Sequence, residues 1–362
     1  MSAAGAQPDS EAPRSRAGRA AGQGLIRQQA ADFVVDELIE MEPDEGGEHL
    51  WLRVRKTGEN TEHVARLLAQ AAGIRAQHVG YAGRKDRHAV TTQWFSLHLP
   101  GRPDPADLAL PPSVEILEMR RRRRKLAVGG LRGNRFCLLV REFAGDAALL
   151  DERLREARVR GVPNYFGAQR FGRGGSNLAQ ALAWLRGERR VDDRKLRGLL
   201  LSAARSQLFN ALLARRVADG SWCEARAGDA LLLDGRGSFF LAEAIEATLR
   251  ERVASGELHP SGALWGRGAL ATRFGVAELE RAVAADHAEL AAGLERAGLE
   301  QERRALRVMP RELAWDWLDG TTLAVSFRLP AGCFATTVLD ELLECRDATL
   351  AAVARPGGRD PA

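Results

Sequence analysis

The chain has 362 residues, of which 45% are hydrophobic, so it is long enough to form two domains that each bury a core. No apolar run is long enough to cross a bilayer, and the N-terminal residues lack the apolar h-region of a signal peptide, which argues against a membrane protein and predicts a cytoplasmic one. The net charge of +5 favours an anionic partner. Only four of the 53 basic residues are lysines, and either a coding bias toward arginine or selection for phosphate contacts explains that ratio.

The first 160 residues predict a strand-rich region. Residues 1–24 are small, polar and basic without periodicity, so we expect a mobile tail, with structure beginning near Leu25. The turn-forming PDEGG at 43–47 predicts a hairpin between the first two strands. The predicted strands are 31–41, 49–56, 92–99, 114–119 and the apolar run after Gly133, and the predicted helices are 61–73 and 147–160.

Residues 161–307 differ from the first 160 in composition and periodicity. Long helices rich in Ala, Leu and Arg are predicted at 192–219 and 276–297, with a hairpin that turns at 234–237 between them. A strand at 321–332 and a short helix capped by Thr336 or Thr337 follow. We therefore expect the C-terminal strand to complete the sheet of the first domain, with the middle segment inserted into it.

Several familiar sites are not encoded. GYAGRKD lacks the spacing and the hydroxyl of a nucleotide P-loop, and the seven histidines lack metal-binding spacings. The glycine-rich GRGGS at 172–176 is a weak phosphate-binding signal. The cysteines are far apart, which predicts buried thiols and neither disulfides nor a zinc site: Cys137, Cys223, Cys333 and Cys345.

The stretch GYAGRKDRHAVTTQWFS, residues 80–96, places one carboxylate, Asp86, among three cations and a histidine. A solvated turn explains the charges, but it leaves the apolar residues on both flanks unexplained. A second cationic run, Arg120 to Lys125, is either a solvated loop or a phosphate-binding segment.

An amide and an aromatic ring follow Gly133 at alternate positions. Residues two apart in a strand share a face, so Asn134 and Phe136 would together suit a planar base. Two alternatives remain: Gly133 and Asn134 form a hairpin turn, and Phe136 belongs to the core.

Four segments resemble the signature segments of the bacterial tRNA pseudouridine synthase D family, TruD. They are residues 80–96, GNRF at 133–136, GVPNYFGAQRFGRGGSN at 161–177 and FRLPAGCFATTVLDELL at 327–343, and the similarity runs from about 25 to 343. The resemblance implies an α+β fold. A mixed-sheet pseudouridine synthase catalytic domain, residues 25–160 and 308–350, would be interrupted by an inserted α/β TRUD domain, residues 161–307, with tails at 1–24 and 351–362.

The resemblance also implies a reaction and its residues. A uridine of tRNA, in this family usually at position 13 of the D-arm, is isomerised to its C-glycoside, pseudouridine. Asp86 matches the catalytic aspartate, and Arg27 matches the basic residue that pairs with it. The positions that match substrate contacts are Phe33, Asn134, Phe136 and Phe334; Phe136 stands where other pseudouridine synthases keep a tyrosine.

This isomerisation involves no redox change, so no cofactor or metal is expected. One ionised carboxylate suffices, and nearby cations favour the ionised form. The expected partner is tRNA, with no membrane and no obligate protein partner. The rival from another class is a non-catalytic RNA-binding protein or tRNA chaperone, which has no need of Asp86. Phosphate contacts are expected at Arg84, Lys85, Arg87, Arg121 and Arg123.

Overall fold

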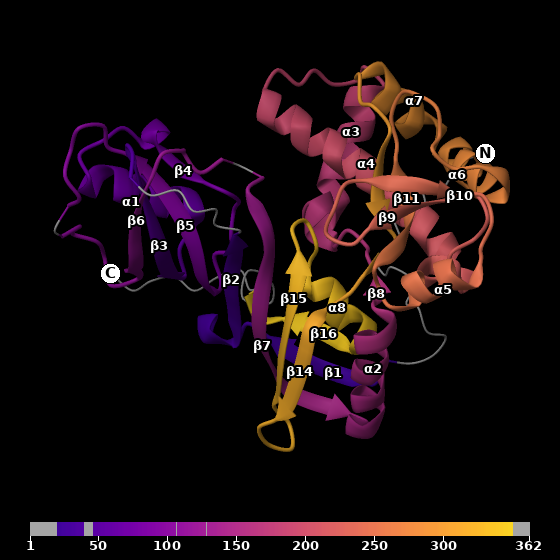
Figure 1. The fold of residues 1–362 in the computed structure, drawn as a ribbon, viewed down its shortest axis with the longest axis horizontal. Coiled ribbons are helices and arrows are strands. Elements are labelled where there is room, and N and C mark those ends of the chain that lie inside the picture. Colours follow the sequence, from indigo (N-terminus) through magenta and orange to yellow (C-terminus); the bar gives the residue numbers. More distant parts are fainter. Residues whose placement is uncertain (1–19, 40–45, 106, 128, 350–362) are drawn as a thin grey trace. The chain divides into compact units, whose positions relative to one another are not determined.

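The computed structural model describes residues 20–39, 46–105, 107–127 and 129–349. Its packing divides the chain into two units (Figure 1). Of the described residues, the first unit contains those of Ala21–Leu150, Arg311–Gly332 and 343–349, and the second contains those of Asp151–Pro310 and Cys333–Leu342. The predicted limits of the inserted domain, 161 and 307, stay a prediction. Most of the predicted tails, 1–24 and 351–362, lies outside the described residues.

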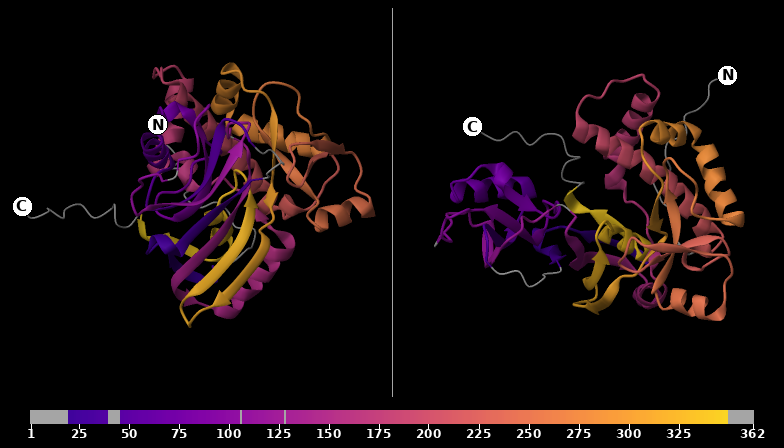
Figure 2. Two further views of the ribbon diagram at one scale, coloured as in Figure 1. Left: turned by 60° about the vertical axis from the view of Figure 1, so that its left-hand side comes forward. Right: turned by 45° about the horizontal axis from the view of Figure 1, so that its top comes forward.

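Ten strands of the described residues form one mixed sheet in the first unit. Its main path is β14-β15-β7-β2-β5-β3-β6, from right to left in Figure 1, and β14 and β15 remain side by side in Figure 2. Strand β1 pairs with β7 and β16, and β4 pairs with β5. The strands are β1 (Gly22–Ile26), β2 (Phe33–Ile39), β3 (His49–Thr57), β4 (Val79–Tyr81), β5 (Val90–His98), β6 (Val114–Arg122), β7 (Leu131–Gly145), β14 (Arg311–Trp317), β15 (Leu323–Pro330) and β16 (Glu344–Asp347).

Helix α1 (Thr61–Ala71) covers one face of this sheet. Its buried residues Val64 and Leu68 are four positions apart, so they lie on one side of the helix. They pack in one cluster with Leu50 and Leu52, which alternate along β3. Full burial of such a side chain is worth about 1.5–3 kcal/mol, and this cluster therefore anchors α1 to the strands next to the Asp86 loop.

The strand order differs from the sequence prediction at one place. The C-terminal strand completes the sheet as predicted, since β15 pairs antiparallel with β7. The predicted hairpin of 31–41 and 49–56 is wrong, because β5 lies between β2 and β3. All residues of β5 except its two ends are buried, as is typical of a central strand whose two faces are both covered. A turn-forming composition indicates that the chain reverses, but it does not determine which strand becomes the partner.

Two glycines lie inside strands where composition predicts a tail or a turn. Strand β1 begins at Gly22, before the predicted start near Leu25, and a Cβ at Gly24 would collide with the side chain of Val140. Gly133 lies within β7, where a Cβ would collide with the backbone of Leu329. The turn alternative at Gly133 is therefore excluded, and Asn134 and Phe136 share a face of β7.

The cysteines all carry free thiols, but they are not all buried as predicted. Cys223 is buried, Cys333 and Cys345 are half-buried, and Cys137 is exposed. The prediction is wrong for Cys137 because this residue alternates with buried neighbours along β7 and therefore lies on the outer face.

The second unit combines helices with two small sheets. Strands β10-β9-β11-β12 form one sheet, and β13 pairs with β8. The bounds are α2 (Ala147–Arg160, which begins in the first unit), β8 (Val162–Pro163), α3 (Ser176–Leu185), α4 (Arg194–Ala218), β9 (Asp229–Leu233), β10 (Phe239–Ala242), α5 (Ala247–Ala254), β11 (Leu258–Leu264), α6 (Phe274–Asp286), α7 (Ala288–Arg296), β12 (Glu302–Ala305), β13 (Arg307–Val308) and α8 (Ala335–Leu342). Short 3₁₀ helices occur at Ala30–Asp32, Ala76–His78, Ala168–Phe171, Arg173–Gly175 and Ser221–Cys223.

Part of the second unit was predicted from the sequence. The hairpin of β9 and β10 and the long helix α4 are confirmed. The helix predicted over 276–297 is instead two helices, α6 and α7, which meet at His287, where the backbone leaves the helical conformation. Within the described ranges, no helix combines the length and the apolar character that a bilayer crossing requires.

Candidate active site

Asp86 lies in the loop between β4 and β5, and 49% of its side chain is exposed. Its Oδ2 accepts a hydrogen bond from Nη2 of Arg27 at 2.8 Å. Arg27 follows β1, and its guanidinium lies 3.7 Å above the ring of Phe33. Three of the predicted site residues therefore meet although they are up to 59 positions apart. The contact places a cation against an accessible carboxylate.

Buried polar side chains of α1 and β5 form hydrogen bonds with the backbone of the Asp86 loop. Gln93 on β5 donates from Nε2 to the carbonyl oxygen of Gly83 at 3.1 Å. Thr61, the first residue of α1, donates to Gln93 and accepts a hydrogen bond from the backbone N–H of Lys85 at 2.9 Å. Thr61 and Gln93 are both buried. Because buried hydrogen bonds are costly to leave unmade, this network restricts the loop to one conformation.

Lys85 is not available for the predicted phosphate contact. Its ammonium lies 2.9 Å from Oε1 of Glu37, and only 5% of its side chain is exposed. The other oxygen of Glu37 accepts the backbone N–H of Trp94 on β5. The charge of Lys85 is therefore used inside the protein to hold its own loop against β2. The interpretation of Lys85 as a phosphate contact is corrected for this reason.

The remaining predicted phosphate contacts differ in exposure. Arg121 donates to the carboxylate of Asp104 and to the carbonyl oxygens of Leu99 and Arg102, which favours a structural role. Arg84 is exposed and pairs with Glu62. The other two, Arg87 and Arg123, are also exposed, so phosphate contacts at these positions stay predictions.

Lys56 is a further member of the site that sequence reasoning missed. It is completely buried, and its Nζ donates to the carbonyl oxygens of Glu59 at 2.7 Å and of Asp86 at 2.9 Å. Burial lowers the pKa of Lys56 from 10.5 to about 8, against the opposing effect of Asp86. A signal was present, because Lys56 continues the alternation of Leu52 and Val54 on the buried face of β3.

We expect the stability that Lys56 contributes to rise with pH. Between its folded pKa of about 8 and its ordinary value of 10.5, the unfolded chain binds more protons at this position than the native protein does. Unfolding therefore becomes less favourable as pH rises through this window, by up to about 3 kcal/mol.

The measurement is a comparison with Lys56→Met, which cannot titrate. Denaturant unfolding of both proteins at pH 7, 8, 9 and 10 should show the stability difference shifting in favour of the wild type above pH 8. A difference that stays constant over this range would contradict the buried, proton-releasing lysine.

The predicted substrate contacts of the first unit lie on neighbouring strands. In the register of β2 and β7, Val35 is opposite Phe136 and Glu37 is opposite Asn134. Phe33 and Phe136 are almost completely buried and meet edge to face, with ring centroids 6.3 Å apart. Asn134 is half-buried, and its Oδ1 has no hydrogen-bond partner in the described part of the protein. A buried acceptor without a partner is unusual and is consistent with a group that binds a ligand.

Phe334 belongs to the second unit. The guanidinium of Arg170 lies over its ring, 5.7 Å from the centroid, and 5.3 Å from the centroid of Phe166. Burial lowers the pKa of Arg170, and its Nε has no hydrogen-bond partner among the described residues. The substrate contact of Phe334 stays a prediction.

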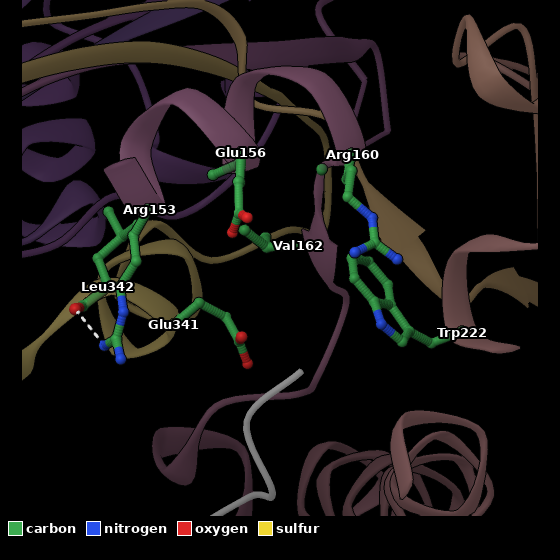
Figure 3. Close-up of a pocket in the computed structure, with 9 residues that line it drawn as sticks. Arg153, Glu156, Arg160, Val162, Trp222, Glu341 and Leu342 are labelled. Atoms are coloured by element: carbon green, nitrogen blue, oxygen red, sulfur yellow. Dashed lines mark hydrogen bonds between the residues drawn. The ribbon is translucent and has the colours of Figure 1, made fainter. Parts of the chain in front are cut away.

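A cavity in the second unit is too small for a nucleotide (Figure 3). Its volume is about 30 Å³, comparable to the space of one water molecule. Arg153 and Glu341 contribute to its lining, and Arg153 donates to the carbonyl oxygen of Leu342 at 3.0 Å. This cavity is therefore not a candidate for the chemistry.

The chemical capacity of the Asp86 site follows from its geometry. A half-exposed carboxylate on a fixed loop, held by a guanidinium, can attack an electrophilic carbon or remove a proton. No group of three or more His, Cys, Asp and Glu residues in the described ranges is arranged to hold a metal ion.

Comparison with known proteins identifies close relatives. The family model described as tRNA pseudouridine synthase D (TruD) matches residues 17–189 and 176–342. The chain is 49% identical over 330 residues to tRNA pseudouridine synthase D of Aeromonas salmonicida, covering 91% of this chain and 93% of that protein. It is 46% identical over 331 residues to tRNA pseudouridine synthase D of Hydrogenovibrio crunogenus, covering 91% of this chain and 95% of that protein.

A solved structure shares the fold. The crystal structure of the putative tRNA pseudouridine synthase D (TruD) from Methanosarcina mazei aligns with a TM-score of 0.69 at 21% sequence identity, covering 91% of this chain and 95% of that chain. This similarity supports the α+β fold with mixed sheets.

Proposed function

Because the chain belongs to the tRNA pseudouridine synthase D family, we propose that it isomerises uridine 13 in the D-arm of tRNA to pseudouridine, with Asp86 as its catalytic residue and without a cofactor. Membership makes the protein a pseudouridine synthase, which is an isomerase (an intramolecular transferase). We further propose that it works in the cytoplasm and needs no obligate protein partner. The pairing of Asp86 with Arg27 carries the proposal.

The reaction rearranges one nucleoside without net gain or loss of atoms. The bond between C1′ of the ribose and N1 of uracil breaks, the uracil turns, and C5 bonds to C1′. The proton on C5 leaves and N1 gains a proton, so the product is an isomer. Asp86 begins this sequence by attacking the sugar or the pyrimidine ring, or by removing a sugar proton, and before the product leaves the bond to Asp86 breaks or the proton is returned. Arg27 places a positive charge against the carboxylate that each of these routes uses and donates a hydrogen bond to its Oδ2 at 2.8 Å.

Asn134 is suited to recognise the displaced uracil. A base that leaves its stack must have its hydrogen-bonding edge satisfied by the protein. The partnerless Oδ1 of Asn134 can accept the N3–H group of uracil. Phe33 and Phe136 are almost completely buried, so they expose little surface on which a base could stack.

Exposed arginines of the first unit suit a polyanionic substrate, and two of them, Arg84 and Arg87, belong to the Asp86 loop. Arg84, Arg87 and Arg123 are exposed, and guanidinium groups bind phosphate oxygens in a bidentate manner. Such contacts position an RNA without reading its sequence.

The function is tested by mapping pseudouridine in tRNA from cells with and without the gene. We expect a pseudouridine at position 13 to disappear with the gene and to return with the wild-type copy. The purified protein should form it in a matching transcript, and a transcript with cytidine at that position is the control. If the pseudouridine that depends on the gene lies at another position, the proposed site specificity is wrong. If no pseudouridine in the tRNA depends on the gene, the proposed function is wrong.

We expect turnover to survive exhaustive chelation. The proposed chemistry is carried by Asp86 and needs no Lewis acid or nucleotide. The assay uses purified protein dialysed against EDTA and tRNA that is folded beforehand in magnesium and exchanged into a polyamine buffer. Activity that vanishes with EDTA, and that one divalent ion restores while tRNA folding is unchanged, would contradict a metal-free mechanism.

A further inference from the structure

A second aspartate contacts the arginine of the site. Asp347, the last residue of β16, accepts a hydrogen bond at Oδ2 from Nη1 of Arg27 at 2.6 Å. Arg27 thereby bridges two carboxylates, with Nη1 on Asp347 and Nη2 on Asp86. Asp347 lies beyond residue 342, where the match to the family model ends.

The bond to Asp347 restrains the rotation of the guanidinium. The Nε of Arg27 is buried and has no hydrogen-bond partner in the described ranges, so the two Nη groups make the contacts that orient its plane. The ring of Phe33 supports one face of the guanidinium but does not determine the direction of its N–H groups. With Asp347 removed, the guanidinium can turn in its own plane and draw Nη2 away from Asp86.

Strand pairing and hydrogen bonds from Thr349 both hold Asp347 in place. Strand β16 runs parallel to β1, with Asp347 opposite Ile26, the residue before Arg27. The Oδ1 of Asp347 accepts hydrogen bonds from the backbone N–H and the hydroxyl of Thr349, at 3.0 and 2.7 Å. Each carboxylate oxygen therefore has a separate role, Oδ1 in orientation and Oδ2 in the contact with Arg27. Only 17% of the Asp347 side chain is exposed, which shields the ion pair from solvent.

The backbone conformation of Arg27 also indicates that the contacts of its side chain determine its position. Its φ of +59° lies in the left-handed region, which is unfavourable for a residue with a side chain. Such a conformation persists where surrounding contacts over-determine it. The contacts with Asp86, Asp347 and Phe33 are of this kind.

From this geometry we propose that Asp347 is a positioning residue that fixes the guanidinium of Arg27 against Asp86. The inference rests on the proposed role of Asp86. It assigns a role to a residue at the C-terminal end of the sheet, outside the segments that resemble the family.

The test compares single-turnover rates of pseudouridine formation in two variants of Asp347. Asp347→Ala removes the acceptor, and the rate should fall roughly ten- to a hundredfold, the range expected when a reacting group is misplaced. Asp347→Asn keeps an oxygen that Arg27 can bond and should recover much of that loss. The affinity for tRNA should change less than about threefold in both variants, because Asp347 acts through Arg27 and not on phosphates.

A double-mutant cycle separates positioning from a structural role. With Arg27→Ala already present, Asp347→Ala should change the rate by less than about twofold, since the group it positions is gone. Glu344→Gln, on the same strand but exposed, is the matched control and should behave as the wild type. If Asp347→Ala unfolds the protein, the same cycle is run with Asp347→Leu, which also removes the acceptor but keeps most of the side-chain volume.

The outcomes distinguish this inference from the proposed function. An equal loss with and without Arg27, or a wild-type rate in Asp347→Ala, would overturn the positioning role. A wild-type protein that forms no pseudouridine in the same transcript would instead overturn the function itself.

Discussion

Asp86→Asn should reduce turnover by at least about a thousandfold, because the amide keeps the shape of the side chain and removes the charge that the chemistry requires. The side chain is half-exposed, and it lies in a loop that Thr61, Gln93 and Lys56 hold through backbone groups. These contacts do not use the carboxylate, so the fold should be retained. Affinity for tRNA should stay within a few-fold of the wild type.

Single-turnover rates and tRNA binding, measured on the same preparations, check this result. Asp107→Asn is the matched control, because Asp107 is exposed and belongs to the same unit. If the rate of Asp86→Asn is near that of the wild type, the assignment of Asp86 as the catalytic residue is wrong. A large loss of affinity with little loss of rate at saturation would show that Asp86 binds the substrate and does not act on it.

Phe136→Ala should destabilise the protein by roughly 3–5 kcal/mol, the usual cost of truncating a buried aromatic side chain. The ring is 6% exposed and packs between Phe33 and Phe327, with centroids 6.3 and 5.6 Å away. At roughly 2–4 °C for each kcal/mol in a domain of this size, the melting temperature should fall by about ten degrees.

Rates per folded molecule decide whether Phe136 also stacks on the uracil. A stacking role predicts a further loss of about ten- to a hundredfold, since stacking on a base is worth roughly 1–3 kcal/mol. Phe327→Ala is the matched control, because Phe327 is opposite Phe136 in the register and completely buried. Phe136→Tyr should be tolerated where the pocket admits a hydroxyl. Normal chemistry in an unstable Phe136→Ala would remove this ring from the site.

The sequence by itself determined the strands, helices and turns that depend on residues close together in the chain. Alternation predicted β3, an aromatic and strand-like run predicted β5, the spacing of Val64 and Leu68 predicted α1, and a short turn predicted the hairpin of β9 and β10. Each of these signals spans a few residues, where backbone geometry determines which side chains share a face. The reaction and the roles of Asp86 and Arg27 were predicted from the family resemblance. The pattern of charges by itself did not distinguish a catalytic aspartate from a solvated turn.

Only the tertiary structure decided which distant residues meet. Strand β5 lies between β2 and β3 and is buried on both faces, which depends on the assembly of the whole sheet. Arg27 meets Asp347 across 320 positions because β1 and β16 pair. Lys85 looks like a surface cation in the sequence, yet its side chain is buried against a carboxylate. The alternation along β3 indicates that Lys56 is buried, but only the fold shows which carbonyl oxygens accept from it. A buried charge is tolerated only with such partners, and the partners are assembled by the fold.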